Sequence, residues 1–175
     1  MKIIGFVYHH GETEMVLKGD SCLLNGNKPM FIPSWTQELG ATDCMILRVS
    51  RLGKEIAPKF AHRYFDAVTP GVDFIALDIL REAEQAGKPW TKALAFDYSL
   101  AIGEWTLLDG EPIEIKDGDW IMTPEEAISE ASKVMTIRQG DLIYIQRRLE
   151  PTMVHKEDII IGEMNGEEKL RCKIK

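Results

Sequence analysis

Short apolar runs, each bounded by Gly, Asn, Asp or Pro, recur along almost the whole chain. Short runs rich in Ile, Val and aromatic residues are typical of β-strands. The clearest pair lies at the C-terminus, where residues 158–164 and 169–174 flank Asn165-Gly166, a dipeptide that favours the type I′ turn of a β-hairpin. The same pattern predicts strands at residues 2–8, 14–17, 44–50, 72–76, 105–108, 113–115, 120–122 and 141–146.

Turn signals separate several of these runs. Thr69-Pro70-Gly71 precedes the run at 72–76 and predicts a turn there. Asp109-Gly110 predicts a hairpin that joins residues 105–108 to 113–115.

Two segments carry helix signals instead. Asp78 can cap a helix over residues 79–86. Thr123 can cap a second helix that runs to about residue 133, because Pro124 suits the first helical position and Glu126 completes a capping box. Many strands and two short helices predict a β-rich α+β fold, and the absence of repeats or linkers predicts one domain over residues 1–175.

Charge and composition exclude several classes of partner. The 175 residues carry a formal net charge of −7, which argues against nucleic acid or an anionic membrane as a partner. No apolar run approaches the ~20 residues of a membrane-spanning helix. Three cysteines without metal-binding spacing suit a reducing compartment, so we expect a cytoplasmic protein.

Five motifs follow one another in a fixed order. They are Leu47-Arg48-Val49, Arg51-Leu52-Gly53-Lys54, Phe60-Ala61-His62-Arg63-Tyr64, Val72-Asp73-Phe74 and Gly140-Asp141-Leu142-Ile143. Together they resemble the fumarylacetoacetate hydrolase family in its short bacterial form, over roughly residues 20–145. The resemblance implies a mixed β roll or sandwich and a homodimer. It also implies three carboxylates that hold Mg²⁺ or Mn²⁺, for hydrolysis or decarboxylation at C–C bonds of acylpyruvate or diketo-acid substrates.

The positions that carry this chemistry in the family have changed. The resemblance places the metal-binding Glu-x-Glu pair at Thr42 and Cys44, and a histidine that often precedes the pair at Gly40. It places a family arginine at Leu77 and the lysine that reaches the substrate at Leu94.

Some candidate site residues remain. Asp73 matches the third metal ligand, while Asp97 and His62 lie in family-typical segments, where His62 fits a structural hydrogen bond better than general-base work. The family's glycine loop is replaced by residues 146–151, in which Arg147 and Arg148 could bind an anion. Outside these motifs, we expect the adjacent His9 and His10 to be surface residues, because neighbours in a strand point apart and chelate poorly.

Three hypotheses follow. The first is an impaired or inactive homologue that needs no cofactor and binds a small acidic metabolite or an active paralogue. The alternative is an active Mg²⁺- or Mn²⁺-dependent hydrolase or decarboxylase, with a site rebuilt around Asp73, Asp97 and Asp43. The third is an interaction module whose pocket is filled by Leu94 and Cys44. Cys44 could be a reactive thiolate, although a buried packing role fits it better.

Overall fold

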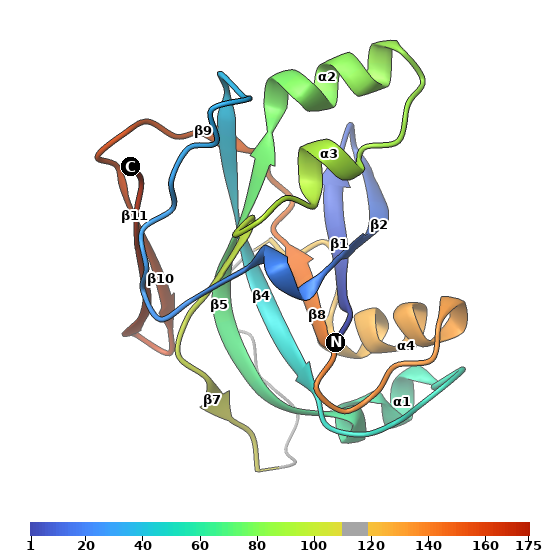
Figure 1. Ribbon diagram of the computed structural model, residues 1–175. Coiled ribbons are helices and arrows are strands. Elements are labelled where there is room, and N and C mark those ends of the chain that lie inside the picture. Colours follow the sequence, from blue (N-terminus) through green and yellow to red (C-terminus); the bar gives the residue numbers. More distant parts are fainter. Residues whose placement is uncertain (110–118) are drawn as a thin grey trace.

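The computed structural model describes residues 1–109 and 119–175. A nine-stranded mixed sheet forms its centre, with the strand order β2-β1-β8-β4-β5-β6-β3, and β7 and β9 pair at its margins with β5 and β4 (Figure 1). The strands of this sheet are β1 (Ile3–His9), β2 (Glu12–Lys18), β3 (Leu23–Asn25), β4 (Leu39–Val49), β5 (Phe65–Ala76), β6 (Leu100–Ile102), β7 (Thr106–Leu107), β8 (Leu142–Gln146) and β9 (Thr152–Met153).

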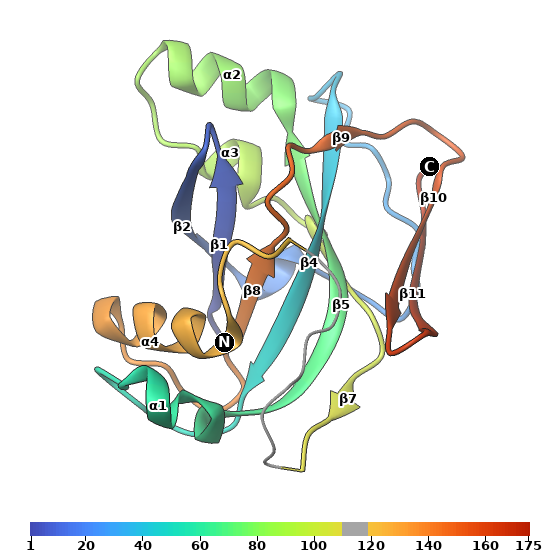
Figure 2. The same cartoon turned by 180° about the vertical axis from the view of Figure 1, so that it is seen from behind.

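A separate two-stranded sheet, β10 (Ile159–Met164) and β11 (Glu167–Lys173), packs beside β5 (Figures 1 and 2). Its turn confirms the predicted hairpin, because Asn165 and Gly166 both have positive φ, at 54° and 78°, as a type I′ turn requires. The mixed, sheet-dominated architecture confirms the predicted fold class.

The helices are short and lie at the two ends of the sheet (Figure 1). Their bounds are α1 (Pro58–Ala61), α2 (Leu77–Gln85), α3 (Thr91–Leu94) and α4 (Pro124–Val134), with 3₁₀ turns η1 (Asp20–Cys22) and η2 (His62–Tyr64). None of the helices in the described part of the chain is long and apolar enough to cross a membrane.

The capping box of α4 forms as predicted, with Thr123 and Glu126 satisfying each other's backbone N–H groups. The predicted cap of α2 is wrong. The helix begins one residue before Asp78, so this carboxylate lies in its first turn. There it accepts hydrogen bonds from the Thr36 hydroxyl and the Gln37 N–H, at 2.5 and 2.8 Å, and so ties the loop before β4 to the helix.

The turn predicted at Thr69-Pro70-Gly71 is also wrong, because β5 runs straight through it. Pro70 lies opposite Met45 in β4, and its carbonyl still accepts a hydrogen bond from the Gly103 N–H. A Cβ on Gly71 would lie 2.4 Å from Ile46 Cδ1. This position therefore needs glycine for close packing rather than for a turn.

The hairpin predicted through Asp109-Gly110, with its second strand at residues 113–115, lies largely outside the described residues. The strand predicted at 120–122 is not among the named strands, and Trp120 forms an isolated β-bridge to Arg147.

The central sheet is buried on both faces. On one face, α4 covers a cluster that includes Phe6, Met45, Leu47 and Ile145. The opposite face carries Val7, Cys44, Ile46, Leu142 and Tyr144. Because strand residues alternate between faces, the register of β4 places Thr42 and Cys44 on this second face, where the candidate site lies.

Candidate functional site

Asp73 forms the centre of a buried polar network on the second face of the sheet. It lies directly opposite Thr42 in the β4–β5 ladder, and it is fully buried. A buried carboxylate is costly unless charge and hydrogen bonds compensate it. The partners of Asp73 therefore decide what the site can do.

A lysine provides the compensating charge. Lys18, the last residue of β2, places its Nζ 2.6 Å from Asp73 Oδ1, and neither side chain is exposed to solvent. The same ammonium donates to the hydroxyl and the carbonyl of Ser99, at 3.0 and 3.2 Å. Its three N–H donors thus have three protein acceptors.

The other oxygen of Asp73 is occupied as well. Gln146, at the end of β8, donates from Nε2 to Asp73 Oδ2 at 2.8 Å. The Gln146 Oε1 in turn accepts from the Tyr8 N–H at 2.9 Å, which fixes the orientation of the amide. Both carboxylate oxygens are therefore held by donors from other strands.

Uncharged side chains complete the surroundings of Asp73. Burial, and then the charge of Asp73, raise the pKa of the Cys44 thiol well above its ordinary value. The same two causes, in the same order, raise the pKa of the Tyr144 phenol. Both groups are consequently neutral near pH 7, and Cys44 is a packed thiol rather than the reactive thiolate considered above.

Glycine makes room for the Tyr144 ring. A Cβ on Gly5, in β1, would lie only 2.1 Å from the ring. The tyrosine can therefore lie over β1, close to the Lys18 ammonium, which is 5.8 Å from the ring centroid.

The other acidic candidates do not join Asp73. Asp43 projects from the opposite face of β4 and lies 4.0 Å from Arg147, while Asp97 is exposed to solvent. His62 lies in η2, before β5 begins at Phe65, whereas Asp73 lies near the other end of that strand. These residues form no carboxylate cluster.

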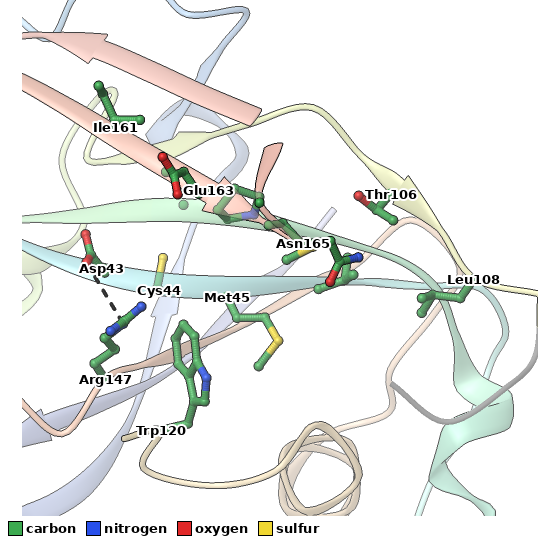
Figure 3. Close-up of a pocket in the computed structure, with 16 residues that line it drawn as sticks. Asp43, Cys44, Met45, Thr106, Leu108, Trp120, Arg147, Ile161, Glu163 and Asn165 are labelled. Carbon is green, nitrogen blue, oxygen red and sulfur yellow. Dashed lines mark ion pairs between the residues drawn. The ribbon is translucent and has the colours of Figure 1, made fainter. Parts of the chain in front are cut away.

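Arg147 and Arg148 lie near a different feature, a cavity of about 860 Å³ between β4, β5 and the β10–β11 hairpin. Figure 3 shows Arg147 beside Asp43 and Trp120, with Glu163 and Asn165 contributed by the hairpin. Arg147 is the basic residue of the cavity lining, and Asp43 and Glu163 are its acidic ones. Arg148 lies over the Tyr8 ring and 3.6 Å from Asp119.

Two of three comparisons with known proteins found similar proteins. No protein-family profile matches the chain. The mitochondrial oxaloacetate tautomerase FAHD1 of Mus musculus is 23% identical over 180 residues, which is 94% of this chain and 81% of the relative. A Yersinia pestis structure of the fumarylacetoacetate hydrolase family has a TM-score of 0.85 at 18% identity, over 99% of this chain and 91% of the other.

These similarities support membership of the fumarylacetoacetate hydrolase family, and the solved structure shares the fold of this chain. A second solved structure shares the fold: fumarylpyruvate hydrolase from Pseudomonas aeruginosa, in complex with Mn²⁺ and pyruvate. Its TM-score is 0.81 at 16% identity, and the match covers 99% of this chain and 89% of that protein.

The residues around Asp73 do not fit the divalent metal that the resemblance to this family implies. Mg²⁺ and Mn²⁺ prefer several hard oxygen ligands in near-octahedral geometry. Here Thr42 and Cys44 stand where the family resemblance implies two carboxylates, and both oxygens of Asp73 are already engaged. The Lys18 ammonium adds a positive charge 2.6 Å from Asp73, which would repel a cation.

Apolar side chains pack around Gly40, Leu77 and Leu94, three further positions to which the family resemblance assigns polar residues. A Cβ on Gly40 would lie 2.9 Å from the Leu77 side chain, so the leucine fills space that a larger residue at position 40 would need. Leu94 is buried in a small cluster with Ile75, Leu80 and Ala93. Apolar packing therefore occupies the positions where the family resemblance places a histidine, an arginine and a lysine.

Lys18 and Gln146 were not identified as partners of Asp73 from the sequence. One feature of the sequence indicated that Lys18 is buried. Lys18 and Val16 are two residues apart in a strand, so they share a face, and Val16 is partly buried. The partners of Asp73 lie 55 and 73 residues away along the chain, however, and no local pattern joins them.

Proposed function

We propose that this chain is a catalytically impaired member of the fumarylacetoacetate hydrolase family, in which an ammonium group neutralises Asp73 in place of a divalent metal. The observation that carries the proposal is the fully buried Lys18–Asp73 ion pair, closed by Ser99 and Gln146. A bound metal would act as a Lewis acid that polarises a substrate carbonyl. The ammonium forms hydrogen bonds with protein groups only and cannot replace that action.

Access to the site supports the same proposal. Asp73 and Lys18 line neither the cavity beside the β10–β11 hairpin nor the smaller one between β2 and α3. A keto acid would have to displace a protein acceptor from Lys18 before it could bind there. The alternative of a rebuilt carboxylate site around Asp73, Asp97 and Asp43 receives no support from their positions.

A chain that has lost catalysis could still act by binding a partner protein or a ligand. We propose three candidate binding partners: a second copy of the chain, an active paralogue and a small acidic ligand. Among the described residues that line the 860 Å³ cavity, Arg147 is accompanied by two carboxylates, Asp43 and Glu163, which favours a protein partner over a free acid. The exposed Ile159 and Ile161 on β10, 53% and 44% accessible, give such a partner apolar surface to cover.

Turnover measurements test the proposed loss of activity. The purified protein, supplied with Mn²⁺, is assayed for oxaloacetate tautomerisation and acylpyruvate hydrolysis, with the Mus musculus tautomerase as the positive control for the first reaction. We expect no enzyme-dependent rate. A metal-dependent kcat of order 1 s⁻¹ or more, abolished by Asp73→Asn, would establish the active alternative and overturn the proposal.

A further inference from the structure

The turn between β1 and β2 brings two histidines to the same side of the chain. His10 has φ +48° and Gly11 has φ +86°, so the backbone reverses within these two residues. In an extended strand, adjacent side chains point to opposite faces. Here the imidazole centroids of His9 and His10 are only 4.1 Å apart. The expectation that these two side chains point apart was therefore wrong, although His10 is exposed as expected.

A carboxylate from a distant helix meets both rings. Glu84, in the last turn of α2, directs Oε1 at the Nε2 atom of His9 and lies 3.5 Å from the Nε2 atom of His10. The three donor atoms lie within 4.8 Å of one another. Figures 1 and 2 both show the β1–β2 turn lying beside the helices at this end of the sheet.

We infer that His9, His10 and Glu84 form a binding site for a divalent transition-metal ion of the Zn²⁺ type. Two imidazole nitrogens and one carboxylate oxygen match the ligands that Zn²⁺ prefers, whereas Mg²⁺ and Ca²⁺ favour all-oxygen sites. The side chains of His9 and Glu84 are only 15% and 23% exposed, while His10 is 75% exposed. A fourth ligand position would therefore face solvent.

The surroundings hold one ligand in place and give the ion a structural consequence. The His9 ring packs edge-on against Trp90, with centroids 4.9 Å apart, which limits its rotation. An ion bound by all three residues would cross-link the β1–β2 hairpin to α2. The same hairpin carries Lys18 at its far end, so this cross-link would stabilise the strand that delivers the ammonium to Asp73.

Calorimetric titration of the chelator-treated protein with Zn²⁺ at pH 7.5 tests this inference. We expect one ion per chain with a Kd of about 1 µM or tighter. Because binding only to the folded protein stabilises it, the Tm should rise when Zn²⁺ is added. Co²⁺ in the same site should give visible ligand-field absorption.

Matched variants locate the site. His10→Ala removes an exposed ligand and Glu84→Gln keeps the side-chain shape, and each should weaken Zn²⁺ binding by at least about 30-fold. His155→Ala serves as the control, because His155 is a similarly exposed histidine beside an acidic residue, Asp158. It should leave the affinity unchanged. A Kd weaker than about 100 µM, or affinity that survives both ligand substitutions, would overturn the inference.

Discussion

Replacement of Lys18 with alanine is expected to lower the free energy of unfolding by about 3–5 kcal/mol. The substitution leaves Asp73 as a buried carboxylate without a counter-charge, and breaking a buried ion pair from one side is far more costly than losing an exposed one. Urea denaturation followed by circular dichroism would measure the loss. A loss below about 1 kcal/mol would contradict the account, because it would mean that the ammonium is not needed to keep Asp73 buried.

The double variant Lys18→Met/Asp73→Asn is the matched control. It removes both charges while keeping similar side-chain volumes, so we expect its stability to lie within about 2 kcal/mol of the natural protein. Together with the single variants Lys18→Met and Asp73→Asn, it completes a double-mutant cycle that isolates the coupling between the two residues. Lys133→Ala, which breaks the exposed Lys133–Glu130 pair, should have little effect.

A second large effect is expected when the metal ligands implied by the family resemblance are restored. The triple variant Lys18→Ala, Thr42→Glu and Cys44→Glu removes the ammonium and places two carboxylates on the face that carries Asp73. Residues i and i+2 of a strand share a face, and position 42 lies opposite Asp73. We expect this variant to bind Mn²⁺ at least about 100-fold more tightly than the natural protein, as measured by calorimetry.

The control for this gain replaces the two glutamates with glutamines in the same Lys18→Ala background. It has nearly the same shape but lacks the charges, so its Mn²⁺ affinity should not exceed that of the natural protein. Because three uncompensated carboxylates repel one another, the glutamate variant should also gain thermal stability when Mn²⁺ is added. Equal affinity in the two triple variants would show that position 42 or 44 does not face the Asp73 site.

Local signals in the sequence predicted much of the fold. The Asn165-Gly166 turn and the Thr123–Glu126 capping box depend on neighbours within a few residues, and both form as expected. The turn predicted at Pro70-Gly71 failed because the glycine serves close packing against Ile46, a contact made by another strand. Turn chemistry and close packing require the same residue type, and the sequence alone does not separate them.

The candidate site was only half predictable. The motifs identified Asp73 and its changed neighbours Thr42 and Cys44, because these positions follow a fixed order along the chain. Lys18 was missed since it reaches Asp73 through the pairing of β2 with β1, a long-range feature. His9 and His10 were misjudged for a different reason: the left-handed conformation of His10 ends the strand alternation on which the expectation depended.

Calorimetric titration of the chelator-treated His10→Ala variant with Mg²⁺ tests the central claim most directly, because this substitution removes an imidazole ligand outside the Asp73 site. The account predicts no saturable binding up to millimolar Mg²⁺, because the Lys18 ammonium and the Gln146 amide already occupy both oxygens of Asp73. Saturable binding in the micromolar range that Asp73→Asn abolishes would contradict it. That result would mean that the metal displaces the ammonium and that the site still functions as a metal centre.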